Sequence, residues 1–323
     1  MEHETLEQVV TRARLAPSIH NVQPARWRLA DGRIEIGCDP TDALPVADPE
    51  DFGAGLSCGA AVEATVLALS AHDLAADVTD LWTETDRATW PGLRMVARIA
   101  VAGGRPLPLA DQLERRFTWR GPFAGDTPQL YGWTRKDTQL VLDAPTRDWL
   151  ADLNDRASFE IMQGGPFRRE LLSWMRLRDD HPRAPSDGLS RRALGLGKGR
   201  ARLVPWQLGP LWPVMNALGR AKSLTAEAEM TRTAPVIACF HRPVTESPVE
   251  TGRAYLRLCL EATHLGFAGW PMAALSDHPA AREEIEGRLA IDPDDRLVQV
   301  IRFGVPMGDP PPRARRPLSE LIP

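Results

Sequence analysis

The sequence predicts an α+β fold made of two similar units, and three observations lead to this. Long apolar helical segments occupy 53–71 and 250–266. Each half also contains a stretch with the composition of a strand, at 94–101 and at 297–303. A run rich in glycine and proline at 103–108 separates the halves. Because helices and strands do not alternate regularly, we expect an α+β chain rather than a βαβ array.

We therefore place a first unit at 1–104 and a second at 105–323. In the first unit, apolar residues at helical spacing predict a helix over 3–16. The segments 26–29 and 33–36 flank a turn that contains glycine, which predicts a β-hairpin.

In the second unit, the patterns predict helices at about 107–115, 145–162 and 166–177, and a strand at 235–240. The region of about 179–225 mixes proline, glycine and tryptophan, so we expect irregular chain there. Long irregular insertions are commonly lids or disordered segments, and the tryptophans favour a lid.

Composition narrows the function classes. The chain is 43% hydrophobic and 25% charged with a net charge of −4, so its overall balance favours neither a nucleic-acid nor a membrane partner. The four cysteines form no C-x-x-C pair, and the seven histidines show no metal-ligand spacing, so we expect no metal. No signal peptide is apparent at the start, and we expect a cytoplasmic protein with reduced thiols.

Several catalytic motifs are missing from the sequence. The glycines at 195–199 lack the spacing of a phosphate-binding loop, no G-x-G-x-x-G follows an expected strand, and no G-x-S-x-G is present. These absences favour an enzyme that depends on a bound cofactor.

The first candidate segment is Ala16-Pro17-Ser18-Ile19-His20-Asn21-Val22-Gln23-Pro24. It places a hydroxyl, an imidazole and two amides on one tight turn, which suits hydrogen bonding to the edge of a heteroaromatic ring. A helix end followed by an ordinary turn would also explain it, and on chemistry alone that explanation is favoured.

The second candidate segment is Arg116-x-Thr118-x-Arg120. Alternate residues of an extended segment face the same side, so two guanidinium groups and a hydroxyl can converge on one anion. A solvated basic run is the simpler alternative. Likewise Arg313-x-Arg315-Arg316 reads by itself as a charged tail.

Together these segments resemble the nitroreductase family of flavoproteins, which carries R-x-[ST]-x-[RK], P-S-x-x-N-x-Q-P and C-terminal [KR]-x-R motifs. The whole chain resembles the Acg-type branch, in which two family domains are fused. Four further stretches support that branch: 187–190, 193–196, 261–266 and 315–318.

The resemblance implies a nitroreductase-like fold: a pseudo-dimer in which each unit has a mixed sheet flanked by helices. In the family, FMN lies at the dimer interface between the Arg motif of one subunit and the P-S-x-x-N turn of the other. Here the turn occurs only in the first unit and the Arg motifs only in the second. One composite site, and hence one FMN per chain, is implied.

The resemblance also implies the cofactor-binding residues. Arg116, Thr118, Arg313 and Arg315 would hold the phosphate, and Arg120 would lie near flavin N1/O2. The first unit would add Pro17, Ser18, His20 and Asn21, and the segment that faces flavin N5 would add Met272, Ala273 and Ala274. The usual Glu-Gly is Ala273-Ala274 here, and the Trp that usually follows Gln-Pro is Ala25, so the substrate pocket departs from the family pattern.

By this resemblance, hydride would pass from a transiently bound NAD(P)H through flavin N5 to a nitroaromatic, quinone or similar small acceptor, and no side chain would act as catalyst. The alternative function is that of a lid-covered protein that sequesters FMN with little or no turnover. A third and less favoured function is an enzyme that fragments the flavin. The fused chain would act as a monomer, and a further homodimer stays open.

Overall fold

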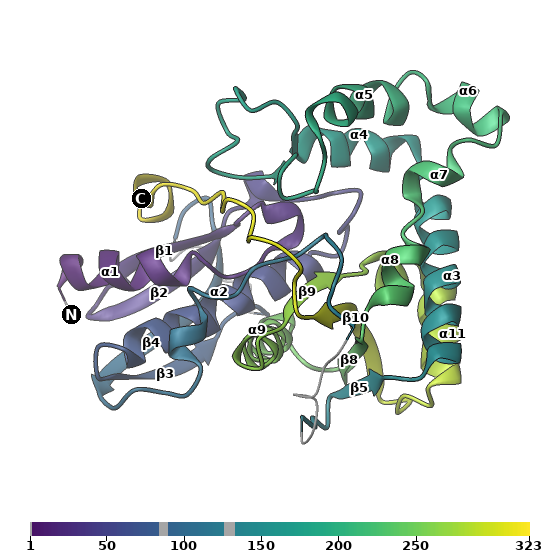
Figure 1. Ribbon diagram of the computed structural model, residues 1–323. Helices are drawn as coiled ribbons and strands as arrows, with labels where there is room; N and C mark the ends of the chain where they lie inside the picture. Colours follow the sequence, from purple (N-terminus) through teal and green to yellow (C-terminus); the bar gives the residue numbers. More distant parts are fainter. Residues whose placement is uncertain (1, 84–89, 126–132) are drawn as a thin grey trace.

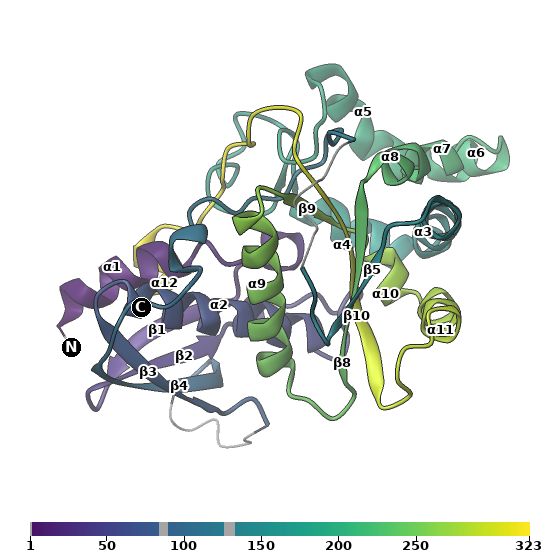
Figure 2. The ribbon, with the colours of Figure 1, turned by 60° about the horizontal axis from the view of Figure 1, so that its bottom comes forward.

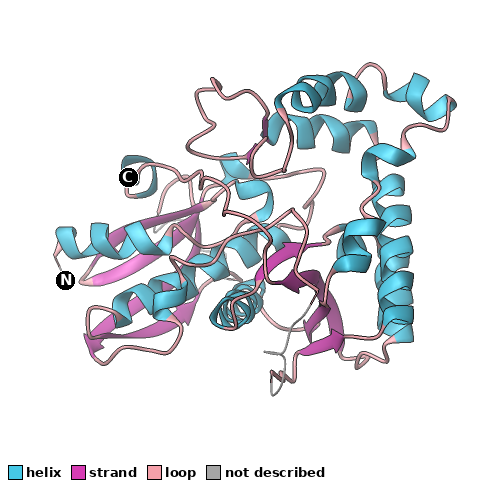
Figure 3. Cartoon of the chain, viewed as in Figure 1, coloured by secondary structure: helices cyan, strands magenta, loops and turns pink. Residues whose placement is uncertain are grey.

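The computed structural model describes residues 2–83, 90–125 and 133–323 (Figure 1). Two four-stranded sheets lie on either side of a pair of long helices, and further helices cover the outer side of the second sheet (Figure 3). The predicted α+β class and its two-unit organisation are confirmed by this architecture.

The first sheet has the strand order β1-β2-β4-β3, and all of its pairings are antiparallel. The elements of this unit are α1 (His3–Ala13), β1 (Ala25–Ala30), β2 (Arg33–Cys38), α2 (Phe52–Ser70), β3 (Leu74–Asp80) and β4 (Arg94–Gly103). The predicted hairpin is therefore correct. Asp31 and Gly32 form its turn with φ of 48° and 73°, a left-handed geometry in which glycine is not strained.

The second sheet has the order β5-β8-β10-β9 and follows the same path. Its elements are β5 (Thr138–Val141), β8 (Val236–Pro243), α9 (Pro248–His264), β9 (Ala268–Pro271) and β10 (Asp295–Gly304). In both units the chain runs strand, strand, long helix, strand, strand, and the last strand inserts between the second and third. This shared topology supports a duplication that the residues themselves do not display.

The two long helices α2 and α9 pack against each other between the sheets (Figure 2). They approach closely at two glycines. A Cβ on Gly59 would lie 2.1 Å from the carbonyl oxygen of Val249, and one on Gly252 would lie 2.1 Å from that of Leu56. Deeper in the contact, the fully buried carboxylate of Glu63 receives hydrogen bonds from arginines of α9. The crossing therefore joins the units over a continuous buried surface.

The apolar helix α2 is long enough to span a membrane by length and composition, but most of it is buried inside the protein. Nearly all of its residues are buried, which agrees with the core helix expected over 53–71. A packed core helix accounts for its hydrophobicity.

Helices also fill most of the region between β5 and β8. They are α3 (Ala144–Ile161), α4 (Gly165–Trp174), α5 (Lys198–Leu208), α6 (Trp212–Ala217), α7 (Lys222–Thr225) and α8 (Ala228–Thr233), and the short strands β6 (Met175–Arg176) and β7 (Leu189–Ser190) pair in parallel. The expectation of irregular chain over 179–225 is therefore wrong from Lys198 onward. Pro213 lies in the first turn of α6, where a missing N–H costs no hydrogen bond.

Two other expectations need correction. The predicted helix at 107–115 is only the 3-10 turn η3 (Ala110–Gln112), because Leu109 has a φ of 73°. The first sheet is antiparallel throughout its described strands rather than mixed. Among the described residues, the second sheet gains a parallel contact only where Thr118 bridges Gly269 at its edge.

The remaining elements are η1 (Ile19–Asn21), η2 (Pro40–Asp42), α10 (Ala274–Asp277), α11 (Pro279–Arg288) and α12 (Leu318–Leu321). The C-terminal α12 returns to the first unit, where Leu321 packs in the same core as Leu6 and Val10 of α1 (Figure 1). Leu113 belongs to that core as well. The boundary predicted at 104/105 stays a prediction, and chain from both sides of it builds the first core.

Candidate functional site

A cavity of about 1070 Å³ lies where the two units and the α4–α8 region meet. Eleven of the twelve predicted cofactor-binding residues line it: Pro17, Ser18, His20, Asn21, Arg116, Thr118, Arg120, Ala273, Ala274, Arg313 and Arg315. Met272 does not line it. Its side chain is 2% exposed in the core of the second unit, and its N–H donates to the carbonyl of Val300 at 2.7 Å.

The turn from the first unit has an unusual backbone. His20, Asn21 and Gln23 have φ values of 46°, 57° and 56°, a region that side chains other than glycine seldom adopt. Ser18 stabilises it, because its Oγ accepts a hydrogen bond from the N–H of Gln23 at 3.0 Å. The turn thus holds His20 and Asn21 toward the cavity.

His20 is neutral in the physiological pH range. Burial and, to a smaller extent, the nearby Arg120 lower the pKa of His20 to about 4. Its Nε2 is buried without a protein hydrogen-bond partner. The imidazole therefore offers an unused ring nitrogen to a ligand.

The three predicted phosphate-binding arginines converge on one end of the cavity. Arg116 and Arg315 each donate to the carbonyl of Leu15 at 3.1 Å, and Arg313 donates to the carbonyls of Glu114 and Arg116. Within residues 2–83, 90–125 and 133–323, none of the three forms an ion pair with a carboxylate. They are a local excess of positive charge.

The pKa of Arg315 reflects this excess. Burial, followed by repulsion from Arg116, Arg313 and Arg14, lowers it to about 9. The Nε atoms of Arg14, Arg116 and Arg315 are all buried without a partner. Sequence reasoning missed Arg14, which stands at the end of α1 with no motif to mark it. An anion placed among these guanidinium groups would relieve their repulsion.

Arg120 lies on the same extended segment, as predicted from the alternate spacing. The segment is fixed to the second sheet by the Thr118–Gly269 bridge and by a hydrogen bond from the N–H of Trp119 to Gly269 at 3.0 Å. Burial lowers the pKa of Arg120, and its Nη1 donates to the carbonyl of Ala193 at 2.9 Å. Arg120 therefore links the second unit to the chain that covers the cavity.

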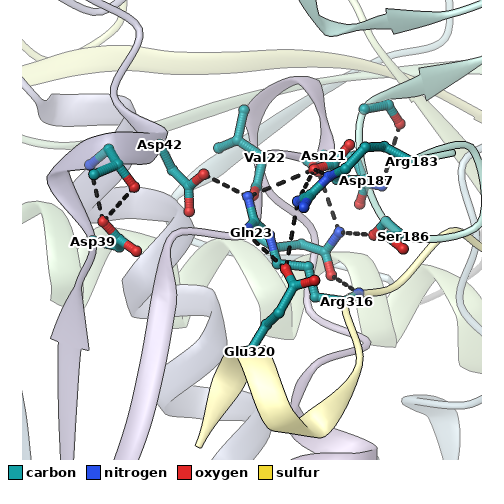
Figure 4. Close-up of polar contacts among 12 residues, drawn as sticks. Asn21, Val22, Gln23, Asp39, Asp42, Arg183, Ser186, Asp187, Arg316 and Glu320 are labelled. Atoms are coloured by element: carbon teal, nitrogen blue, oxygen red, sulfur yellow. Dashed lines mark hydrogen bonds and ion pairs between the residues drawn. The ribbon is translucent and has the colours of Figure 1, made fainter. Parts of the chain in front are cut away.

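The neighbouring Arg316 has a different role, although it belongs to the same basic run. It forms ion pairs with Asp42 and Asp187, and its N–H donates to Oε1 of Gln23 at 3.0 Å (Figure 4). Around it, Asn21 donates to the carbonyl of Gly188 at 3.3 Å. This network ties together the 17–23 turn, the 183–190 loop and the C-terminal segment.

A group of polar residues at another part of the cavity wall was also missed. Asp277, at the end of α10, lines the cavity together with Asp48, Arg282 and Arg296. Burial and, to a smaller extent, Asp48 raise the pKa of Asp277 to about 7. Asp277 is surrounded by protein yet reached by water through the cavity, so it can take up or release a proton near neutral pH.

No family model matches the chain. A Mycobacterium tuberculosis H37Rv protein named "Putative NAD(P)H nitroreductase Rv3131" is 27% identical over 307 residues, which cover 84% of each chain. "Putative NAD(P)H nitroreductase acg" of the same strain is 22% identical over 332 residues, covering 99% of this chain and 95% of its own.

Two solved structures also match part of the chain. The FMN-dependent nitroreductase NfnB from Mycobacterium smegmatis, in complex with NADPH, has 24% identity and a TM-score of 0.36, covering 66% of this chain and 97% of its own. Iodotyrosine deiodinase bound to FMN and 3-iodo-L-tyrosine has 16% identity and a TM-score of 0.37, covering 65% and 95%.

The sequence relatives confirm the resemblance to the nitroreductase family that the motifs predict. Within that family the resemblance reaches the Acg-like branch, whose named member aligns over almost the whole of both chains.

Proposed function

We propose that this protein is an FMN-dependent oxidoreductase of nitroreductase type that binds one FMN per chain in the cavity between its two units. The observation that carries the proposal is the group of Arg116, Arg313 and Arg315 at one end of that cavity, which have no carboxylate partner within the described part of the chain. Arg116 and Arg315 are half-buried, and Arg313 is exposed. A dianionic phosphate is the chemical group that best matches such a cluster.

The residues fit FMN on two further counts. The neutral His20 offers an unpaired ring nitrogen in the cavity that Ala273 and Ala274 also line, where a flat heteroaromatic ring could lie. Arg120 adds a positive charge to the lining of the same cavity. The cavity volume of about 1070 Å³ is ample for a cofactor of this size together with a small substrate.

In this proposal each part of the chain has a stated task. Arg116, Arg313 and Arg315 hold the phosphate, and Arg120 stabilises negative charge on the ring. Bound FMN would supply the electron transfer from NAD(P)H to a nitroaromatic, quinone or similar acceptor. Asp277 would hold a proton at its carboxyl group for the reduced acceptor, since its pKa is raised to about 7.

A second candidate function is FMN sequestration with little turnover. Three contacts support it, because they fasten the covering chain to the cavity: Gly188 N–H to Asn21, Asn21 to Gly188, and Arg120 to Ala193. A cover held this way would keep nicotinamide and acceptor from the ring.

One experiment separates the two functions. The purified protein, loaded with FMN, is mixed anaerobically with NADPH in a stopped-flow instrument. Loss of the flavin's visible absorption within seconds supports the oxidoreductase, whereas a persistent yellow colour would exclude rapid turnover and favour sequestration.

We also propose that the protein is cytoplasmic. Its four cysteines are all buried and free, as expected in a compartment where thiols stay reduced. The fused chain would act as a pseudo-dimer on its own.

A further inference from the structure

Exposed apolar side chains are concentrated on one part of the described surface. Ten large hydrophobic residues are exposed over the whole described surface, and five of them come from α5, α6 and the turns beside them. These five are Leu203, Trp206, Leu211, Val214 and Leu218, with exposures of 54%, 61%, 45%, 56% and 65%. An apolar cluster of this kind usually marks a surface that meets something else.

The cluster lies on the outer faces of the two helices. Leu203 and Trp206 are three residues apart on α5, opposite the buried Ala201 and Leu208. On α6, Val214 faces outward while Trp212, at 3% exposure, packs inward. Both helices form the outer edge of the molecule (Figures 1 and 2). We call this surface the α5–α6 face.

Charge is segregated around the same face. The whole chain has a net charge of −4, yet the segment 188–226 contains seven Lys and Arg residues and no Asp or Glu. Six of these cations are exposed and form no ion pair within the described residues: Arg192, Lys198, Arg200, Arg202, Arg220 and Lys222. They come before and after the apolar cluster in the sequence, and Arg202 lies beside Leu203.

We propose that the α5–α6 face docks on an anionic lipid bilayer. Exposed Trp, Leu and Val side chains can enter the boundary between headgroups and acyl chains, while flanking Lys and Arg side chains contact anionic headgroups. A second copy of this chain fits less well, because a symmetric contact would bring two such basic faces together.

The proposal has a structural consequence for the cavity. The inner side of α5 supplies Val204, Gln207 and Leu208 to the cavity wall, while its outer side carries Leu203 and Trp206. A docked α5 would therefore have the bilayer on one side and the cavity on the other. Docking itself uses no residue assigned to FMN and does not rest on the proposed function.

The test is co-sedimentation of the full purified chain with vesicles. Vesicles containing phosphatidylglycerol should retain the protein, vesicles of phosphatidylcholine alone should not, and added salt should weaken the retention. Retention by neither kind of vesicle, or equal retention by both, would overturn the proposal.

Variants locate the contact. The double variant Trp206→Ser/Leu218→Ser should lose most of the binding. The matched control Met307→Ser/Leu142→Ser changes residues of 61% and 53% exposure outside the face and should bind like the original protein. Arg202→Gln should weaken partitioning about fivefold, since each such cation contributes about 1 kcal/mol near an anionic surface.

Circular dichroism and thermal unfolding of each variant confirm that the fold is retained. Equal binding by both double variants would contradict the assignment. Analytical ultracentrifugation tests the alternative occupant. If the original protein is a dimer that does not bind vesicles, and if Trp206→Ser/Leu218→Ser is monomeric while the control variant stays dimeric, a second copy covers the face and the proposal is wrong.

Discussion

Arg116→Ala should weaken FMN binding, and the contacts of Arg116 indicate how large the loss of affinity should be. Removing one charge-assisted phosphate contact costs about 1.5–3 kcal/mol, which corresponds to roughly ten- to a hundredfold in Kd. After burial, repulsion from Arg116 is also the largest cause of the lowered pKa of Arg315. Since a group with a pKa of about 9 is already protonated at neutral pH, the relief of this repulsion adds no charge to Arg315, and we expect a loss of roughly ten- to a hundredfold.

The assay is fluorescence titration of apoprotein with FMN. Arg115→Ala is the matched control, because Arg115 is exposed, carries the same charge on the adjacent position and does not line the cavity. It should leave the affinity unchanged. Equal affinities for Arg116→Ala and the original protein, or equal losses in both variants, would show that the phosphate is placed wrongly.

Three further predictions follow from particular contacts. FMN affinity should fall as pH rises through about 9, because the phosphate binds the protonated Arg315, whose pKa in the free protein is lowered to that value; titrations that stay flat across this range would contradict the role of Arg315. Gly252→Ala should lower stability by about 1–3 kcal/mol in thermal or urea unfolding, because its Cβ would meet backbone at 2.1 Å, whereas Gly287→Ala, with open space around it, should cost nothing. Asn21→Ala should speed amide hydrogen exchange around Gly188, because it removes the side chain that donates to the Gly188 carbonyl at 3.3 Å; unchanged protection would mean that other contacts hold the loop.

Much of the fold could be predicted from local patterns. The hairpin at 25–38 and the helices α2, α3 and α9 were visible as turn chemistry, apolar content and helical spacing. The short strands β5 and β9 were missed, since four residues each carry too little periodicity. Their places are set by pairing with β8 and β10, which are distant in sequence.

The α4–α8 region shows a different limit. Proline and glycine in 198–225 suggested irregular chain, but Pro213 occupies a first turn and Pro205 lies within α5. Inward residues such as Trp212 and Leu208 share a small core with α3 and α4, and this tertiary packing outweighs weak helix propensity.

The candidate site was predictable only as separate pieces. The motifs identified Arg116, Asn21 and Arg315, but nothing in the sequence showed that Arg315 would face the cavity while Arg316 pairs with buried carboxylates. Likewise Asp277 reaches the cavity, and Arg14 comes close to Arg315, through the packing of elements far apart in the chain. Such roles depend on tertiary contacts that a motif does not encode.

The central claim is that one composite cavity binds one FMN per chain. Native mass spectrometry of the full chain, equilibrated with excess FMN, tests it most directly. The account predicts a mass increase of one FMN per chain, which Arg116→Ala weakens and Arg115→Ala leaves intact. An absent adduct, or two FMN molecules bound with equal affinity to each chain, would contradict it.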